Sequence, residues 1–220
     1  MVGFILAIDG PAGSGKTTVS IEVARKLGWT HIDTGAMYRA VTYYALLNKI
    51  DLFDENLYGF LETIDINYKE NQLYLNGINI SAELRSVEVT KNVSLVSSLK
   101  VVRDNLVSLQ RKVAAKIKFV VMDGRDIGTV VLPNANLKIY LTALIEERAK
   151  RRLLENTNVF KNSSLEEIIE DIKLRDFKDS NRDISPLTKS DDAIEIDTTY
   201  MTIDEVSDEI IKIIKSRRIN

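Results

Sequence analysis

The sequence predicts an α/β protein built on a central parallel sheet. Two observations support this class. Short apolar runs, typical of strands buried on both faces, alternate along the chain with segments whose apolar residues recur at helical spacing. Such alternation indicates a parallel sheet whose strands are joined by helices. With 220 residues, of which 45% are hydrophobic, the chain has the length and composition of one domain, with or without an insertion.

The first strands and helices are predicted near the N-terminus. Residues 4–9 form an apolar run. A glycine-rich loop follows, and after it comes a helical pattern that ends at a glycine. Residues 29–33 are typical of a second strand. Asp33 and Thr34 can cap a helix that runs to about residue 47.

The segment from about 57 to 97 differs from its surroundings, and we interpret it as an insertion into the main sheet. Its apolar residues alternate at the spacing of strands, and an Asn-Gly pair predicts a hairpin turn. The elements predicted here and just beyond are strands at 64–68, 72–75 and 78–80, and a helix over 82–115 with a break near Ser97 and Ser98.

The remaining elements continue the α/β alternation. A loop is predicted over 183–192, directly before the last strand. The predicted strands cover 119–123, 137–141 and 193–197. The predicted helices cover 145–156, 164–177 and 202–217.

The composition excludes several kinds of chemistry. The chain has no cysteine, which excludes disulfides, cysteine-ligated metals and a thiol nucleophile. Its single histidine, His31, excludes a site with several histidine ligands and leaves one candidate base for a Ser-His-Asp triad. Because no nucleophile is paired with His31 in the sequence, we interpret it as a structural residue of the second strand.

Charge and hydropathy indicate the cellular location of the protein and the kinds of partner it can bind. The 30 basic and 32 acidic residues give a net charge of −2, which argues against binding nucleic acid through a bulk positive field. No apolar stretch reaches about 18 residues, the length that spans a bilayer. The apolar N-terminus lacks the basic start of a secretory signal. We therefore expect a cytoplasmic protein with no membrane and no nucleic-acid partner.

The loop after the first strand carries the clearest chemical signal. Residues Gly10–Thr17 (GPAGSGKT) match G-x-x-x-x-G-K-[ST], with a strand before the motif and a helix after it. The glycines let backbone N–H groups point at phosphate oxygens, and the helix N-terminus adds its positive end. Lys16 can bridge β- and γ-phosphates, and the Thr17 hydroxyl can ligate Mg²⁺. The flanking elements favour nucleoside triphosphate binding over a chance glycine turn.

A second motif, Asn48-Lys49-Ile50-Asp51, spells the N-K-x-D sequence with which GTPases bind guanine. That motif normally lies far downstream, behind a buried strand, whereas this copy ends the helix after the second strand. No D-x-x-G follows a strand either. The context therefore argues against a GTPase.

Two strand ends carry further candidate residues, at the edge of the sheet where ligands bind in open parallel folds. Arg39 lies about one turn into the helix after the second strand, and the alternative is a solvated arginine on a capped helix. Asp123 ends a later strand and can approach Mg²⁺ through water. Arg125 follows a glycine that lets the backbone approach a ligand, and the alternative is a tight turn in which Arg125 and Asp126 pair.

Two clusters of charged residues complete the candidates. Arg175, Asp179 and Arg182 fall at i, i+4 and i+7, which is one face of a helix. The alternative for this cluster is an ordinary salt-bridge ladder. The second cluster, for which the alternative is a solvated helix face, comprises Arg148, Arg151 and Arg152.

Several of these motifs, in this order, resemble the bacterial cytidylate kinase family. The resemblance runs from about residue 4 to residue 214 and is carried by IDGPAGSGKTT, IDTGAMYRAVT, DGRDIGTVVLP and DDAIEIDTT. It also includes an R-D-x-x-D-x-x-R pattern, formed by Arg175, Asp176, Asp179 and Arg182, and a following SPL.

The resemblance implies the fold of a P-loop nucleoside monophosphate kinase. This is a single three-layer α/β/α domain over 1–220 with a small β+α monophosphate-binding subdomain and a short helical lid. The implied parts are a core at 1–56, 98–146 and 167–220, an insertion at about 57–97, and a lid at about 147–166.

The resemblance also implies roles on the donor side. The residues implied to hold the ATP phosphates are Gly10, Pro11, Ala12, Gly13, Ser14, Gly15, Lys16, Thr17 and Thr18. Those implied to close over ATP from the lid are Arg148, Arg151 and Arg152. The metal site would comprise Thr17 and, directly or through water, Asp123.

On the acceptor side, the resemblance implies contacts to each part of CMP. Thr34, which is a serine in some relatives, would help hold the ribose. The phosphate would be held by Arg39, Arg125 and Arg182, and ribose and phosphate by Arg175 and Asp179. The cytosine edge would be held by Ser94, Arg103 and Asp126. Phe177 departs from the family pattern, because some relatives carry a charge there.

The implied activity is the ATP-dependent phosphorylation of CMP and dCMP to CDP and dCDP by in-line transfer of the γ-phosphoryl group. Lys16, Arg125 and Arg182 would be catalytic, Mg²⁺ the cofactor, and the enzyme a monomer whose partners are its two nucleotide substrates. The alternatives are another small P-loop kinase with a different acceptor, or a nucleotide-dependent switch or nucleic-acid-binding module. The net charge of −2 and the lack of a basic or aromatic stripe argue against the last.

Overall fold

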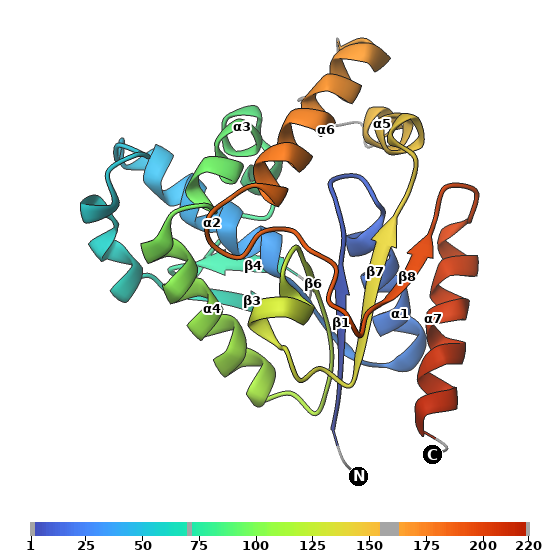
Figure 1. Ribbon diagram of the computed structural model, residues 1–220. Coiled ribbons are helices and arrows are strands. Elements are labelled where there is room, and N and C mark those ends of the chain that lie inside the picture. Colours follow the sequence, from blue (N-terminus) through green and yellow to red (C-terminus); the bar gives the residue numbers. More distant parts are fainter. Residues whose placement is uncertain (1–2, 70–71, 155–162, 219–220) are drawn as a thin grey trace.

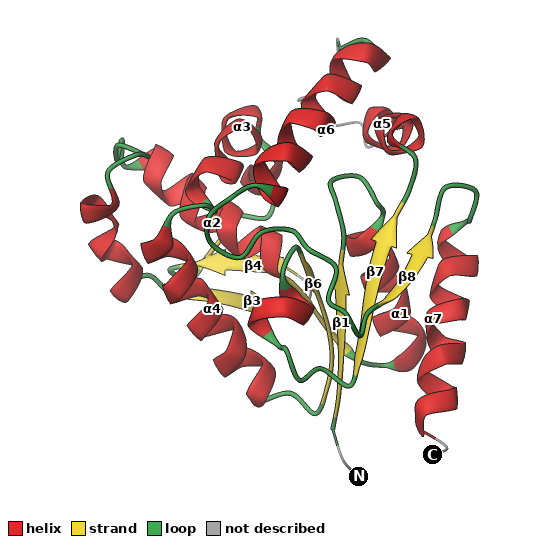
Figure 2. Ribbon diagram, viewed as in Figure 1, coloured by secondary structure: helices red, strands yellow, loops and turns green. Residues whose placement is uncertain are grey.

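The centre of the molecule is a five-stranded parallel sheet, seen in a computed structural model that describes residues 3–69, 72–154 and 163–218 (Figures 1 and 2). The strand order is β2-β6-β1-β7-β8. Each strand lies within one residue at either end of the position predicted from its apolar run. The strands are Phe4–Asp9 (β1), Thr30–Asp33 (β2), Phe119–Gly124 (β6), Leu137–Thr142 (β7) and Ile194–Asp197 (β8).

Helices cover both faces of this sheet, which confirms a three-layer α/β/α architecture. On one face, α1 (Lys16–Leu27) and α7 (Ile203–Arg218) pack against Leu6 and Ile8 of β1. On the other face, α4 (Lys100–Ala115) and the helical turn η3 (Ile127–Val131) pack against Ala7, the residue between them. Successive side chains of a strand point to opposite faces, so a strand that is apolar throughout fits between two helical layers.

The chain between α2 (Thr34–Leu47) and α4 forms a second, smaller sheet. Its antiparallel strand order is β3-β4-β5, and Asn76 and Gly77 join the last two strands with positive φ angles of 50° and 79°. Both residues tolerate this conformation, which gives the turn favoured in two-residue hairpins. The elements here are η1 (Glu55–Glu62), β3 (Ile66–Lys69), β4 (Gln72–Leu75), β5 (Ile78–Asn79), η2 (Glu83–Arg85) and α3 (Val87–Val96).

The small sheet packs against α2, α3 and the first half of α4 through one apolar cluster. Leu73 and Leu75 of β4 contribute to it, as do Val41 of α2 and Leu106 of α4. This packing brings the N-terminal end of α2 and the inner side of α3 to the edge of the main sheet where its strands end (Figure 1).

Two further helices, α5 (Ile145–Leu154) and α6 (Leu165–Ser180), lie over the carboxyl ends of the main strands (Figure 1). They pack on each other through Ala149, Ile168 and Ile172. Part of the predicted lid, residues 155–162, lies outside the described residues.

The end of α6 corrects one prediction. The helix stops at Ser180 with Asn181 as its C-cap, so Arg182 lies beyond it. The helical i+7 spacing therefore does not apply to Arg182. The chain turns back instead, because the Leu187 backbone N–H donates to the Asp179 carbonyl and Arg182 Nε donates to the Ser185 carbonyl. No described helix is both long and apolar enough to cross a bilayer.

Candidate active site

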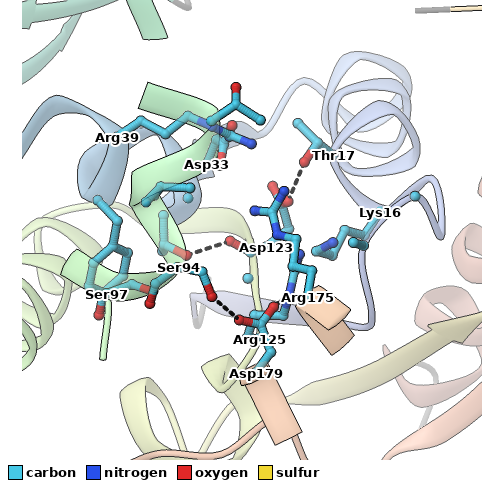
Figure 3. Close-up of a pocket in the computed structure, with 18 of the residues that line it drawn as sticks. Lys16, Thr17, Asp33, Arg39, Ser94, Ser97, Asp123, Arg125, Arg175 and Asp179 are labelled. Carbon is cyan, nitrogen blue, oxygen red and sulfur yellow. Dashed lines mark hydrogen bonds and ion pairs between the residues drawn. The ribbon is translucent and has the colours of Figure 1, made fainter. Parts of the chain in front are cut away.

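A cavity opens where β1, β2 and β6 end, between the phosphate loop and the elements that face it (Figure 3). Most of the residues predicted to bind nucleotides line it together. On the donor side these are Ala12, Gly13, Gly15, Lys16, Thr17, Thr18, Asp123 and Arg152. On the facing side they are Thr34, Arg39, Ser94, Arg103, Arg125, Asp126, Arg175, Asp179 and Arg182.

The phosphate loop has the backbone that its glycines predict. Gly13 and Gly15 adopt positive φ angles of 75° and 84°, and α1 starts directly after Gly15. A Cβ on Gly13 would lie 3.1 Å from the backbone oxygen of Arg148, so a side chain there meets both strain and crowding. Glycine thus allows α5 to lie close against the loop.

The predicted lid arginines Arg148 and Arg151 hold this loop and do not line the cavity. Arg148 Nη1 donates to the Ala12 carbonyl at 3.0 Å and pairs with Asp176, whose other oxygen accepts the Ala12 backbone N–H at 3.1 Å. Arg151 donates to the side chain and carbonyl of Thr198, and the Thr198 hydroxyl donates to the Ser14 carbonyl. In this arrangement the two arginines fix the loop backbone from α5.

Lys16 is buried in the loop with its ammonium group close to the cavity. Its Nζ donates to the Pro11 carbonyl at 3.1 Å. Burial, and next the positive charge of Arg125, lower the pKa of Lys16 well below its ordinary value. A phosphate group bound beside the ammonium group would offset both effects, because a nearby negative charge favours the charged form of lysine.

Asp123, at the end of β6, is hydrogen-bonded on both carboxylate oxygens. Its Oδ2 accepts from the Thr17 hydroxyl at 2.7 Å, and its Oδ1 accepts from His31 Nε2 at 2.6 Å. Burial opposes ionisation of this carboxyl, but the bonds from His31 and Thr17 and the nearby positive charges hold its pKa below the ordinary value.

The contact with Asp123 gives His31 a partner that its sequence position did not indicate. Burial disfavours charge on His31, yet the hydrogen bond and the charge of Asp123 outweigh it and raise the pKa of the imidazole. Because Asp123 lies between His31 and Thr17, the three residues do not form a Ser-His-Asp type of triad, in which histidine contacts the hydroxyl.

Thr17 and Asp123 fit a magnesium ion better than any metal that needs a protein cage. No group of three or more His, Asp or Glu able to hold a metal occurs in the part of the chain described. Mg²⁺ usually takes one or two protein oxygens and completes its shell with water and substrate phosphates. A hydroxyl and an ionised carboxylate 2.7 Å apart, beside a phosphate loop, match that donor set.

The facing side joins residues from several elements. Arg125, just after β6, donates from Nε to Asp179 Oδ2 on α6 at 2.9 Å. Ser94 on α3 donates to the other carboxylate oxygen of Asp179 at 3.4 Å (Figure 3). The alternative considered for Arg125, a tight turn in which it pairs with Asp126, does not occur: Arg125 pairs with Asp179, and Asp126 pairs with Arg103 of α4.

Arg103 and Asp126 form a buried pair at the deep end of the cavity. Each is less than 5% exposed. Arg103 also donates to the Ser97 carbonyl and lies over the Tyr38 ring, 5.3 Å from its centre. Arg182 Nη2 approaches the second oxygen of Asp126 at 3.6 Å. The pair presents one donor and one acceptor group in a fixed arrangement, as recognition of a polar molecular edge requires.

The arginines around the cavity repel one another. Burial, followed by the charges of Arg125 and Arg39, lowers the pKa of Arg175 to about 9. The pKa of Arg182 is also lowered, by burial and by the charge of Arg103. Such crowding costs free energy without a bound ligand, and phosphate groups would relieve it.

Thr34 connects the two sides. Its buried hydroxyl donates to the Asp123 backbone carbonyl at 2.7 Å. The strand that carries the Asp123 carboxylate toward Thr17 is thus also anchored to the start of α2, where Arg39 lies.

Some of the predicted residues lie behind the cavity lining, and some lining residues were not predicted. Asp33 and Tyr38 belong to the same sequence motif as Arg39, so the motif could have identified them as cavity residues. Predicted residues outside the lining are Gly10, Pro11, Ser14, Arg148 and Arg151. Lining residues absent from the prediction are Asp33, Gly35, Tyr38, Arg85, Thr90, Val93, Ser97 and Gly124.

The N-K-x-D sequence does not take part in this site. Asn48 caps the C-terminus of α2 and donates to the Tyr44 carbonyl, and Asp51 accepts the Phe53 backbone N–H. Asn48 and Asp51 are exposed, and none of the four residues lines the cavity.

Comparison with known proteins identifies close relatives. A family model described as cytidylate kinase matches residues 6–216. The cytidylate kinase of Acholeplasma laidlawii is 51% identical over 218 residues, which cover 99% of this chain and 98% of that protein. The cytidylate kinase of Clostridioides difficile is 49% identical, with 96% of this chain and 98% of that protein covered.

Solved structures share the fold at much lower identity. An uncharacterized protein from Eubacterium ventriosum has a TM-score of 0.52 and 16% identity, with 97% of this chain and 99% of that one covered. A protein from Thermus thermophilus has a TM-score of 0.51 and 18% identity, with 98% of both chains covered. At such identities the likeness concerns the fold alone.

Proposed function

The chain belongs to the cytidylate kinase family, and from this premise we propose that it transfers the γ-phosphoryl group of ATP in line to CMP or dCMP, giving CDP or dCDP. One observation carries the proposal. The same cavity is lined by a phosphate loop on one side and by arginines from several elements on the other. Two nucleotides whose phosphates meet need cationic groups from both sides.

ATP is the phosphoryl donor. The backbone N–H groups of the phosphate loop and the start of α1 would hold its phosphates, with Lys16 between the β- and γ-groups. The roles of Arg148 and Arg151 would be to keep the loop in shape, since they bind its carbonyl at Ala12 and the neighbouring Thr198. Arg152 lines the cavity and can reach the phosphates directly.

Thr17 and Asp123 would hold Mg²⁺ together with the ATP phosphates, Asp123 directly or through water. The ion, when bound, neutralises charge on the β- and γ-phosphate oxygens. The Thr17 hydroxyl and the ionised Asp123 carboxylate already face each other at 2.7 Å, which supports this assignment.

The acceptor would lie on the facing side. Arg39, Arg125 and Arg182 would bind its 5′-phosphate. Thr34 would help hold its ribose, and Arg175 and Asp179 would contact ribose and phosphate. The buried Arg103–Asp126 pair, with Ser94, would bind the polar edge of cytosine. A base with a different edge would leave these buried groups unpaired, which is a strong source of discrimination.

No general base is needed, because the attacking oxygen belongs to a phosphate that is already an anion. Catalysis would come from positioning and from neutralising charge by Lys16, Arg125 and Arg182. We assign the core to 1–56, 98–146 and 167–220, the acceptor subdomain to about 57–97 and the lid to about 147–166. Closure of lid and subdomain would exclude water, which competes as an acceptor.

A coupled assay with Mg²⁺-ATP and CMP, dCMP, UMP or AMP tests the function. We expect turnover with CMP and dCMP at least about tenfold better than with AMP, because the buried edge contacts discriminate strongly. A preference for AMP or UMP would instead assign the chain another acceptor. Nucleotide binding without transfer to any of the four would favour a switch or a nucleic-acid-binding module.

We also propose that the enzyme is a monomer in the cytoplasm, with neither nucleic acid nor a membrane as partner. Light scattering of the purified protein tests the first point. A mass of twice 24.8 kDa would contradict it.

A further inference from the structure

His31 is the single histidine of the chain, and its position in the sheet places it beside the metal-binding carboxylate. In the parallel pairing of β2 with β6, His31 is opposite Val121 and Asp33 is opposite Asp123. Alternate residues of a strand share a face, so these side chains lie on the same side of the sheet. That side is the one covered by α1, which carries Thr17.

Each oxygen of the Asp123 carboxylate accepts a hydrogen bond from a different residue. Its Oδ1 accepts from His31 at 2.6 Å and its Oδ2 accepts from Thr17 at 2.7 Å. The imidazole is about nine-tenths buried, and the carboxylate is 1% exposed. With one oxygen held from the strand side, the other is fixed toward α1 and the phosphate loop.

A neighbouring acidic group is a reason for such a restraint. Asp33 lies opposite Asp123 in the sheet, so the two carboxyl groups share one face at this strand end. A carboxylate next to another acidic group tends to turn away from it. The hydrogen bond that His31 donates to Oδ1 opposes this rotation.

We propose that His31 is a positioning residue, which holds Asp123 Oδ1 so that Oδ2 faces Thr17 and the magnesium-bearing end of the ATP phosphates. This proposal rests on the proposed function, since it concerns the metal that accompanies ATP. His31 does not line the cavity, and the side-chain hydrogen bond that the described part of the chain gives it goes to Asp123, so we expect its effect to pass through Asp123. Partners that orient a metal ligand in this way usually change metal affinity about 10- to 100-fold when removed.

The test compares three variants by titration calorimetry with ATP, once with Mg²⁺ and once with EDTA. His31→Leu removes the donor, while His31→Gln supplies an amide N–H at a similar reach. Thr30→Val changes the exposed neighbour of His31 on the same strand and is the matched control. The measured quantity is the ratio of ATP affinity with Mg²⁺ to that with EDTA.

We expect the ratio to fall about tenfold in His31→Leu, and to stay within about threefold of the wild type in His31→Gln and Thr30→Val. The Mg²⁺ concentration for half-maximal rate should rise in parallel in His31→Leu, while the KM for CMP stays unchanged. If His31→Leu does not fold, His31→Phe replaces it, since an aromatic ring fills the same space without the N–H.

An unchanged ratio in the folded variant lacking the N–H would overturn the proposal, as would equal losses in His31→Leu and His31→Gln. A rise in the KM for CMP as large as the metal effect would point to a general structural role and would also overturn it. Because the calorimetry uses ATP alone, a failure of CMP as acceptor would refute the proposed function and leave this result standing.

Discussion

The two sides of the cavity are built by different means. The donor side is built mainly from a single stretch of chain, the phosphate loop at residues 10–18, whose glycine geometry lets backbone amides face the phosphates, with Asp123 and Arg152 beside it. The facing side consists of side chains from α2, α3, α4, the turn after β6, α6 and the loop beyond it. The first is fixed by local conformation, and the second depends on how six separate segments pack.

This difference teaches where affinity and selectivity can be changed. Backbone amides bind any phosphate chain and cannot be removed one at a time, so few side chains on the donor side are decisive. On the facing side each arginine or aspartate is a separate contact and also supports its neighbours, as in the buried Arg103–Asp126 pair. Substitutions on the donor side should therefore either abolish turnover or leave it nearly unchanged. Substitutions on the facing side should change the KM of one substrate and not of the other.

The largest effect is expected at Lys16, the one side chain of the loop with a charge aimed at the phosphates. Lys16→Ala should lower kcat by about 1,000-fold or more, because the amides cannot supply its positive charge in the transition state. Steady-state assays of kcat and KM check this. Lys100→Ala, on an exposed lysine paired with Asp104, is the control and should change kcat less than twofold.

A Lys16→Ala variant with near-normal turnover would contradict this prediction, because the donor side would then work through its backbone amides alone. Thermal melting of the variant separates this outcome from misfolding.

The next effect is expected at Arg182, where the facing side should show selectivity for one substrate. Arg182→Ala should raise the KM for CMP about 100-fold and the KM for ATP less than threefold, since a charged hydrogen bond to phosphate is lost on the acceptor alone. Arg25→Ala, on an arginine that is paired with Glu22 at the surface, is the matched control. Equal losses for both substrates would remove Arg182 from the acceptor side.

The same difference explains what could be predicted from sequence. The phosphate loop and all main strands were predictable because apolar runs and glycine positions are local. The contact of His31 with Asp123 was not, because it requires β2 beside β6, and no sequence pattern gives that strand order. The helical spacing that joined Arg182 to Arg175 was also misleading, since α6 ends at Ser180 and the chain turns back through hydrogen bonds such as that from Leu187 to Asp179.

Two buried carboxyl groups should make the stability of the protein depend on pH in opposite directions. Directly before the phosphate loop, Asp9, the last residue of β1, accepts backbone N–H groups of Ile127 and Gly128, but burial raises its pKa from 3.8 to about 7. On the facing side, burial of Asp179 is outweighed by the charges of Arg125 and Arg175, and its pKa is lowered. A raised pKa makes ionisation destabilising, and a lowered one makes it stabilising.

The expected signs are therefore opposite. The Tm of the wild type relative to Asp9→Asn should fall as the pH rises from about 4 to about 7, where Asp9 loses its proton. The Tm of the wild type relative to Asp179→Asn should fall as the pH drops below 3.8, where the favourable carboxylate is lost. Melting curves over pH 3 to 8 measure both, and parallel curves for either pair would contradict the corresponding shift.

The smallest effect is expected at Asp51, in the N-K-x-D sequence at the end of α2. Its exposed carboxylate accepts the nearby Phe53 N–H, so Asp51→Ala should change stability by at most about 0.5 kcal/mol. The ratio of rates with ATP and GTP as donors should change less than twofold. If the variant altered that ratio strongly, a segment of the acceptor half would be selecting the donor base. The division into a donor side made of backbone and an acceptor side made of side chains would then be wrong, because a side chain outside the cavity and on the acceptor half would recognise the donor base.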